Sequence, residues 1–170
     1  MRIVTLLTDF GTADGYVAEM KGVILSANPE ARIVDITHEI PPHDIEAGAF
    51  TLLAACSSFP AGTIHVAVVD PGVGSERRPV LIEAGDQFFV GPDNGLFSYV
   101  CEKLGMQRAV VLTDPKYFRV PVSKTFNGRD IFAPVAAALS TGVKPARFGS
   151  ETTELVQLRS LEPHVSSRGP

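Results

Sequence analysis

VAVVDPGVGSERR, residues 66–78, is the stretch that decides the fold. It continues an apolar run, and we predict a β-strand over Ile64–Val69 that is buried on both faces, as strands of parallel sheets are. Asp70 stands at the carboxyl end of this strand, where open α/β sheets place their ligands. Pro71–Gly74 ends the strand and lets the backbone approach a ligand closely, and Arg77-Arg78 follows. The alternative interpretation is an ordinary Pro-Gly turn with two solvated arginines.

The composition indicates a single acidic domain. Its 170 residues fall within the roughly 100–200 residues of one domain, and 45% of them are hydrophobic, enough for a substantial core. The formal net charge is −4, and lysine and arginine do not cluster beyond Arg77-Arg78. This charge pattern argues against a nucleic-acid partner and against an anionic membrane surface.

Several further observations favour a cytoplasmic protein without a metal. No apolar run reaches the roughly 20 residues of a membrane span, and Met1 leads directly into a strand with no signal peptide ahead of it. Cys56 and Cys101 fall in different predicted helices, and we expect both to be small buried hydrophobic residues in a reducing compartment. Histidines at 38, 43, 65 and 164 form no metal-binding motif, so we predict no metal site.

Strands alternate with helices along the chain. We predict strands at 2–8, 32–36, 64–69, 80–83, 87–90 and 108–112, a further strand within 155–158, and helices at 14–27, 45–58, 96–104 and 131–139. Asp44 is the expected N-cap of the second helix. This order predicts an α/β fold, a three-layer αβα domain with a largely parallel sheet. We expect the domain to span residues 1–160 and residues 161–170 to be a tail or linker.

Polar residues follow the ends of predicted strands at several places. Asp9 ends the first strand, Asp70 ends the third, and the Asn127–Asp130 loop precedes the last helix. In a parallel sheet such positions converge on one edge, where a carboxylate can accept two hydrogen bonds from vicinal hydroxyls. The competing interpretations are a turn residue for Asp9 and helix capping for Asn127 and Asp130. A GxGxxG motif, a Walker lysine and a GxSxG motif are all missing. The residues alone therefore indicate an acidic cleft for a small molecule.

Five segments in order carry a resemblance to a known family. They are TDFGTADGYVAEMKG (8–22), IPPHDIEAGAF (40–50), VVDPGVGSERR (68–78), FVGPDNGLF (89–97) and TFNGRDIFAPVAA (125–137). They closely resemble the S-adenosyl-L-methionine (SAM) hydroxide adenosyltransferases, relatives of the bacterial fluorinases and chlorinases. The resemblance covers nearly the whole chain. It implies an enzyme that converts SAM and water into adenosine and L-methionine, with SAM as substrate and no cofactor.

The resemblance also implies roles for particular residues. Asp9 would hold the ribose hydroxyls, Asp14 and Tyr16 would line the methionine side, Phe59 would pack near the adenosyl group, and Gly128 would border the substrate. Asp70 and Arg77 match two members of an Asp-Arg-His set that positions and activates the attacking water. Because the sulfonium is already a good leaving group, such an enzyme needs an aligned nucleophile and a dry site rather than a strong acid.

This sequence departs from the family pattern in two ways. The third member of the catalytic set, a histidine in TFHGRD, is replaced by Asn127. Asparagine cannot take a proton at neutral pH, although it can still orient water. The family's chains also continue into a C-terminal β-barrel, which supplies most of the adenine pocket across a homotrimer interface. We expect that barrel to be absent from this chain, which leaves half of the site missing.

Three functions are therefore compatible with the sequence. The first is a SAM hydrolase, impaired by Asn127 and by the missing barrel. The second is a non-catalytic relative that binds SAM or adenosine. The third is a SAM-dependent halogenase, although the halogenases carry a tyrosine-serine pair in place of Asn127-Gly128 and an aromatic residue in place of His43.

Overall fold

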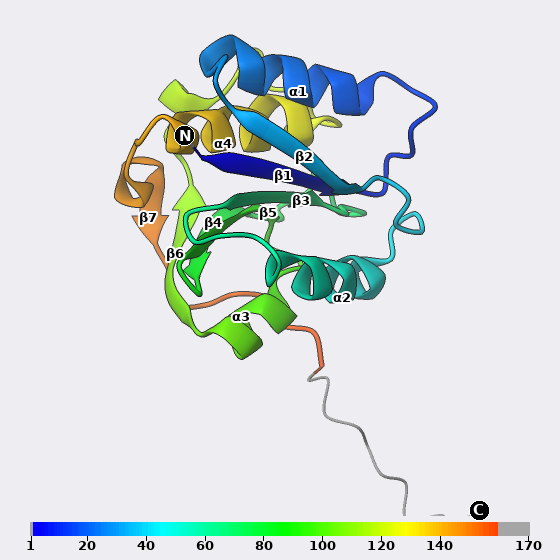
Figure 1. The fold of residues 1–170 in the computed structure, drawn as a ribbon, viewed down its shortest axis with the longest axis vertical. Coiled ribbons are helices and arrows are strands. Elements are labelled where there is room, and N and C mark those ends of the chain that lie inside the picture. Colours follow the sequence, from blue (N-terminus) through cyan, green and yellow to red (C-terminus); the bar gives the residue numbers. More distant parts are fainter. Residues whose placement is uncertain (1, 160–170) are drawn as a thin grey trace, which may run out of the picture.

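The middle layer of the molecule is a seven-stranded sheet (Figure 1). The structure, a computed structural model, describes residues 2–159. The strands are β1 (Ile3–Thr8), β2 (Arg32–Thr37), β3 (Ile64–Val68), β4 (Pro79–Ala84), β5 (Gln87–Pro92), β6 (Met106–Leu112) and β7 (Gly149–Glu151). Their order across the sheet is β2-β1-β3-β5-β4-β6-β7.

The sheet is mixed, with most of its strands pointing the same way. β2, β1, β3 and β5 pair in parallel, whereas β4 is antiparallel to both β5 and β6, and β7 is antiparallel to β6. The prediction of a largely parallel sheet is therefore confirmed for strand direction, since only β4 and β7 are reversed. The reversal at β4 comes from a hairpin between β4 and β5, whose turn lies between Ala84 and Gln87.

Helices cover both faces of the sheet, which confirms the three-layer α/β prediction. Figure 1 shows α1 (Tyr16–Ala27) and α4 (Ala133–Ser140) on one face, and α2 (Ile45–Cys56) and α3 (Ser98–Leu104) on the other. Three short helices are η1 (Pro115–Tyr117), η2 (Gly128–Phe132) and η3 (Pro145–Arg147). Each face has its own core: Leu6 packs on the α1/α4 side and its neighbour Leu7 on the α2/α3 side, as the two-residue period of a strand requires.

Local signals in the sequence account for the central elements. Every residue of β3 is buried, as predicted for an apolar strand in the middle of a parallel sheet. Asp44 is the predicted N-cap of α2, and its carboxylate accepts the Ala47 N–H at 2.9 Å. Cys56 lies buried in α2 and Cys101 half-buried in α3, and both are unpaired. Burial raises the pKa of the Cys56 thiol and raises that of Cys101 to about 11, so both are protonated at neutral pH.

The chain order creates a crevice at the carboxyl ends of β1 and β3. The chain leaves β1, returns in β2 on one side of it, and then crosses to β3 on the other side. After β3 the chain continues to β4 and β5, which lie on the side of β3 away from β1, so the connections that follow β1 and β3 lead to opposite sides of the sheet. Figure 1 also shows α1 and α2 on opposite faces. Open α/β sheets bind ligands at such a switch point.

The C-terminal part of the described chain differs from the prediction. The strand expected within 155–158 was wrong, and a strand forms instead at β7. The reason is that the backbone of the 155–158 segment bonds to side chains rather than to a strand: the Val156 N–H donates to Asp93 Oδ1 at 2.9 Å and the Leu158 N–H to Ser98 Oγ at 2.8 Å. The tail expected at 161–170 lies outside the described residues.

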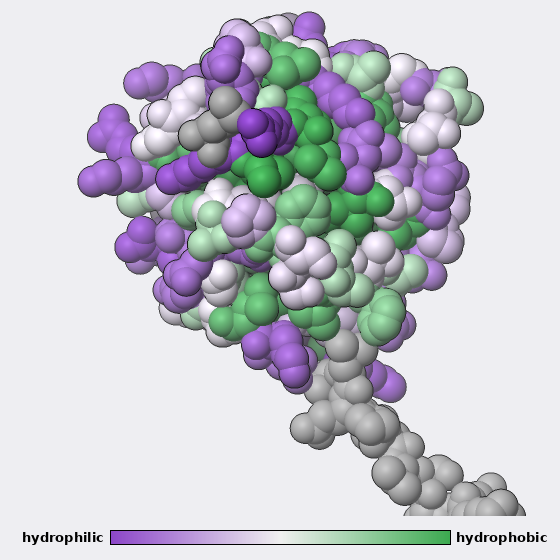
Figure 2. Space-filling view, in the orientation of Figure 1, coloured by the Kyte–Doolittle hydropathy of each residue, from purple (hydrophilic) through white to green (hydrophobic). Residues whose placement is uncertain are grey.

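The surface mixes polar and apolar areas. On the face seen in Figure 2, hydrophobic surface lies in several areas among hydrophilic side chains. Large exposed hydrophobic residues include Phe50 on α2, which is 58% exposed, and Val120, which is 75% exposed. Within residues 2–159, no helix is both long and apolar enough to cross a membrane.

Candidate active site

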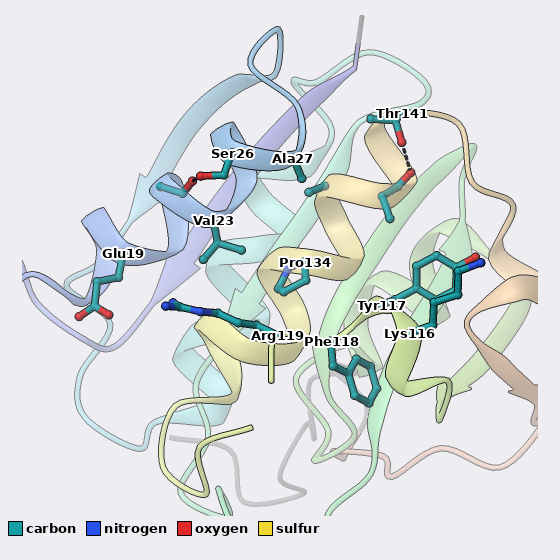
Figure 3. A pocket seen from close by; sticks show the side chains of 13 residues that line it. Glu19, Val23, Ser26, Ala27, Lys116, Tyr117, Phe118, Arg119, Pro134 and Thr141 are labelled. Atoms are coloured by element: carbon teal, nitrogen blue, oxygen red, sulfur yellow. Dashed lines mark hydrogen bonds between the residues drawn. The ribbon is translucent and has the colours of Figure 1, made fainter. Parts of the chain in front are cut away.

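A cavity larger than the one at the switch point lies elsewhere on the described chain. It is an open groove of about 860 Å³ with α1 on one side, residues 116–119 on the other and α4 between them (Figure 3). Its lining includes small side chains such as Ala27 and Ala137 together with Lys116 and Arg119, and none of the predicted site residues. Volume alone therefore does not identify the site.

A smaller cavity of about 280 Å³ lies at the switch point between β1 and β3. Its lining comes from the end of β3, from the loops that follow β1, β2 and β3, and from the segment that leads into η2: Asp9, Phe10, Pro42, His43, Val68, Asp70, Val73, Thr125, Phe126, Asn127 and Gly128. Asp9, Asp70, Asn127 and Gly128 were predicted from the sequence to share one site. The structure brings these four residues together; their roles stay predictions.

Two residues of the cavity lining, Asp70 and Asn127, are joined through Arg77, which is not itself part of the lining. Arg77 grips Asp70 with two hydrogen bonds, from Nε to Oδ1 at 3.1 Å and from Nη2 to Oδ2 at 2.5 Å. Arg77 Nη2 also donates to Asn127 Oδ1 at 2.8 Å. The side chains of Asp70 and Arg77 are only 5% and 7% exposed, so this is a buried pair rather than two solvated groups. The solvated-arginine interpretation is therefore wrong for Arg77.

Burial changes the chemistry of the Asp70 carboxyl. Burial raises the pKa of Asp70 above its ordinary 3.8, and the neighbouring Asp9 adds to the rise, although Arg77 and the Gly72 N–H oppose it. A carboxylate with a raised pKa is a stronger base than a solvated one. The Arg77 guanidinium also lies over the Phe132 ring, 5.6 Å from its centroid, which keeps water away from the far side of the pair.

The loop that carries Asp70 is held against the segment that carries Asn127. Gly74 has φ 79°, a left-handed conformation that favours glycine. A Cβ there would lie 2.7 Å from the Lys124 carbonyl oxygen. The close backbone approach that the glycines predict is therefore present, but the partner is the 124–127 segment of the same chain.

Asp9 faces the cavity from the end of β1. Its Oδ2 accepts the backbone N–H of His43 at 2.9 Å, and among residues 2–159 its side chain has no other hydrogen-bond partner. His43 has φ 67°, which is uncommon outside glycine and occurs at functional sites more often than elsewhere. The turn at His43 thus holds one oxygen of Asp9.

Aromatic side chains form a further part of the cavity wall, through Phe10 and Phe126. Phe10, Tyr16 and Phe126 pack edge to face, with ring centroids 5.2–6.2 Å apart. Tyr16 is 47% exposed, so it extends this wall beyond the cavity toward solvent. A Cβ on Gly128 would lie 3.1 Å from Met20 Sδ and 3.4 Å from Phe126 Cε2, so glycine allows the wall to close around this position.

Three predicted site residues, Asp14, Tyr16 and Phe59, are not part of the cavity lining. Phe59 follows α2 at the amino end of β3, opposite Asp70, and packs edge to face on His65 at 5.6 Å. His65 is buried and its pKa is lowered to about 4 by burial, so Phe59 borders a neutral packing cluster. The structure therefore does not bring Phe59 to this cavity. Asp14 is exposed in the loop before α1 and is not part of the cavity lining.

The sequence interpretation missed part of the lining. Phe10, Thr125 and Phe126 stand beside predicted site residues, so their place in the chain could have suggested them. Pro42 and His43 lie in the proline-rich segment after β2, and their contribution depends on a left-handed turn that no local pattern shows. Asp9 and Asp70, by contrast, were found because both directly follow apolar strands.

Comparisons with known proteins give matches over most of the chain. The family described as "SAM hydroxide adenosyltransferase N-terminal domain" matches residues 4–149. An (R)-S-adenosyl-L-methionine hydrolase from Methanocaldococcus jannaschii is 45% identical over 96% of this chain, and one from Salinispora tropica is 47% identical over 91% of it. A fluorinase from Actinoplanes is more distant, at 27% identity over 98% of the chain. The chain spans 62%, 60% and 64% of the lengths of these three relatives.

Solved structures show the same fold. An uncharacterized conserved protein from Thermotoga maritima superposes with a TM-score of 0.90 at 39% identity, over 92% of this chain and 61% of its own. A conserved hypothetical protein from Thermus thermophilus gives a TM-score of 0.79 at 41% identity, over 93% and 62%. Sequence, fold and the family match over 4–149 lead to one conclusion: this chain belongs to the SAM hydroxide adenosyltransferase family and carries its N-terminal domain.

Proposed function

We propose that this chain is the domain of a SAM hydrolase that holds the ribose and the attacking water. The observation that carries the proposal is the buried Asp70–Arg77–Asn127 cluster on the wall of a 280 Å³ cavity at the switch point. Relatives named (R)-S-adenosyl-L-methionine hydrolase, 45–47% identical to this chain, support the same reaction. Because the chain spans only 60–62% of those two relatives, the activity proposed is that of the whole protein.

The proposed reaction is an in-line displacement at the ribose C5′ of SAM. A new bond forms between the water oxygen and C5′ while the C5′–S bond breaks. Its electron pair neutralises the sulfonium, so methionine leaves as a thioether without needing a general acid. The water gives up one proton, and the raised pKa of Asp70 makes this carboxylate the strongest proton acceptor of the cluster. The reaction as written needs no cofactor.

Each side chain has a distinct part in this proposal. Asp9 would accept hydrogen bonds from the ribose hydroxyls through the oxygen that His43 leaves open. Arg77 would keep Asp70 ionised and fixed, and Asn127 would orient the water through its Oδ1 oxygen. Alignment of a bound nucleophile can supply much of the rate without a strong base.

A second candidate function is a domain that binds SAM or adenosine without reaction. Asn127 favours it, because its amide already bonds to Arg77 and to the Ser123 carbonyl at 3.0 Å and cannot take a proton. The halogenase hypothesis has less support than the hydrolase hypothesis, since the fluorinases are only 24–27% identical to this chain.

The deciding experiment is product analysis in H₂¹⁸O. SAM is incubated with this chain, and in parallel with this chain joined to the C-terminal remainder of the Methanocaldococcus relative. A hydrolase releases methionine and adenosine with ¹⁸O on C5′. Adenosine binding by calorimetry without turnover in either protein would instead favour the binding function. A 5′-chloro product in chloride buffer would favour a halogenase.

Assembly and location are also proposals. The trimer that the family resemblance implies is supported by exposed hydrophobic residues such as Phe50 and Val120, since apolar surface promotes association. A sharp monomer by light scattering at tens of micromolar would contradict it. Free thiols at Cys56 and Cys101 support a reducing, cytoplasmic location.

A further inference from the structure

A second buried carboxylate lies behind the cluster, outside the cavity. Asp130 is fully buried, and its Oδ2 accepts the Ser123 N–H at 2.8 Å. Arg129 donates to it from Nε at 2.7 Å and from Nη2 at 3.1 Å, and the Asp130 backbone carbonyl accepts the Arg119 N–H at 2.8 Å. Asp130 therefore fastens the 119–123 loop at both of its ends.

Arg129 anchors this carboxylate to the outer layer. It donates from Nη1 to Glu19 on α1 at 2.9 Å, and its guanidinium lies 4.9 Å from the centroid of the Phe126 ring. Burial by itself would raise the pKa of Asp130, but the hydrogen bonds from Arg129 and the Ser123 N–H outweigh it and hold the pKa below 3.8. Asp130 is thus a fixed anion at neutral pH.

The fastened loop presents one acceptor to Asn127. The Ser123 N–H is held by Asp130, and the Ser123 carbonyl accepts Asn127 Nδ2 at 3.0 Å. Only the NH₂ end of an amide can donate to that carbonyl, so the oxygen end must face Arg77 Nη2, 2.8 Å away. A flipped amide would set oxygen against oxygen at Ser123 and N–H against N–H at Arg77.

We propose that Asp130 is a positioning residue that, through Ser123, sets which end of the Asn127 amide faces Arg77 and the cavity. A continuous set of contacts runs from Asp130 to Ser123, Asn127, Arg77 and Asp70. Asp130 does not line the cavity itself. Its effect on rate rests on the proposed function, because only a reaction at the cluster gives the amide orientation a kinetic consequence.

The direct test observes the Asn127 amide without any turnover. Asparagine occurs only at positions 28, 94 and 127, so protein labelled with ¹⁵N-asparagine gives a simple side-chain NH₂ spectrum, assigned with Asn127→Asp. In Asp130→Asn we expect the Asn127 NH₂ signals to move and to exchange faster with solvent. The signals of Asn28, bonded to Ser140 Oγ, and of Asn94, bonded to the Val69 carbonyl, should stay in place.

Asp114→Asn is the matched control. Asp114 also accepts a backbone N–H, that of Lys116 at 3.0 Å, but the hydrogen bonds of its side chain do not reach Asn127. Unchanged Asn127 signals in a folded Asp130→Asn chain would overturn the proposal. If Asp130→Asn does not fold, Arg129→Gln gives the same readout, because it loosens the carboxylate without removing it.

A kinetic cycle tests the same link in protein that cleaves SAM. Asp130→Asn should lower kcat by on the order of 10²-fold with little change in KM, the size expected for misaligned groups. In an Asn127→Ala background the same change should have no further effect, because the residue it positions is gone. Multiplying effects would overturn the proposal. Absence of SAM cleavage in every protein would reject the proposed function and leave the NMR result to decide the role of Asp130.

Discussion

Arg77 and Arg78 are neighbours in the chain, yet their two ion pairs have different surroundings. Arg77 binds Asp70 beside the 280 Å³ cavity. Arg78 binds Asp93, from Nε at 3.0 Å and from Nη2 at 2.6 Å, and also donates to the Glu154 carbonyl. The Asp93 carboxylate is buried as well, with its side chain 3% exposed, but its remaining oxygen accepts the Val156 N–H.

The two pairs differ in how the hydrogen-bonding capacity of the carboxylate is used. Both carboxylate oxygens of Asp93 accept hydrogen bonds from the protein, and these bonds fasten residues 154–156 to the turn after β5. The Asp70 carboxylate accepts its side-chain hydrogen bonds mainly from Arg77, and Asp70 also lines the cavity. A buried aspartate–arginine pair is therefore not by itself a sign of catalysis. Asp70 differs from Asp93 in that it lines a cavity, and the proposed function depends on this difference.

The largest expected effect is on the rate of SAM cleavage, and it compares substitutions of the asparagine beside each of the two ion pairs. Asn127→His puts a proton acceptor next to Asp70 and Arg77 and should raise the rate of SAM cleavage by roughly 10²–10⁴-fold, the usual contribution of a general base. Asn94→His, next to Asp93, is the control and should not raise the rate. Chromatographic assay of adenosine release measures both. An Asn127→His protein no faster than its parent shows that position 127 is not the missing catalyst.

A smaller effect is expected on adenosine binding. Asp9→Ala removes the carboxylate proposed to hold the ribose and should weaken binding by about 1.5–3 kcal/mol, or roughly 10- to 150-fold in Kd. Asp93→Ala should bind adenosine like the parent at equal concentrations of folded protein. Calorimetry that finds the same affinity in Asp9→Ala and in the parent rules out this role for Asp9.

The free energy of unfolding should depend more on Asp93 than on Asp70, the opposite of what we expect for the reaction. Asp93→Ala loses hydrogen bonds from Arg78 and from the Val156 N–H and should destabilise the chain by about 1–3 kcal/mol. The loss stays moderate because Arg78 is 39% exposed and can turn to water. Asp70→Asn should cost less, since burial already favours the uncharged form of that carboxyl. Urea denaturation compares them, and a larger loss in Asp70→Asn would break the contrast.

The smallest effect is a dependence of stability on pH. Because the folded pKa of Asp70 lies above 3.8, folding favours its protonated form, and that contribution is lost as pH rises through the folded pKa. Asp70→Asn removes this loss, so its stability relative to the parent should increase between pH 3.5 and pH 7, roughly the range around a carboxyl pKa. A relative stability that is independent of pH over this range would contradict the raised pKa.

Much of the fold could be predicted from the sequence because its signals are local. The apolar run at 64–69 predicts a strand buried on both faces, and Asp44 marks a helix start through one side-chain bond. Asp9 and Asp70 could be placed together because parallel neighbouring strands end at the same edge. Their convergence needed only the strand order, not the details of packing.

The rest depends on contacts between residues that are far apart in the sequence. The 155–158 segment looks like a strand, but its N–H groups bond to Asp93 and Ser98, about 60 residues earlier. The orientation of the Asn127 amide depends on Ser123, Arg77 and Asp130 at once. The place of Phe59 depends on its packing against His65 at the far end of β3. Such contacts leave no pattern in the local sequence.

The most direct test of the central claim measures adenosine release from SAM by the parent, Asp70→Asn and Asp93→Asn proteins at equal concentrations of folded protein. We expect Asp70→Asn to be slower by roughly 10²–10⁴-fold, because its neutral amide can neither hold Arg77 as an ion pair nor accept the water proton. We expect Asp93→Asn to keep the parent rate, because its carboxylate only fastens residues 154–156. Equal rates in the two variants, whether retained or lost, would contradict the assignment of the reaction to the Asp70–Arg77 pair.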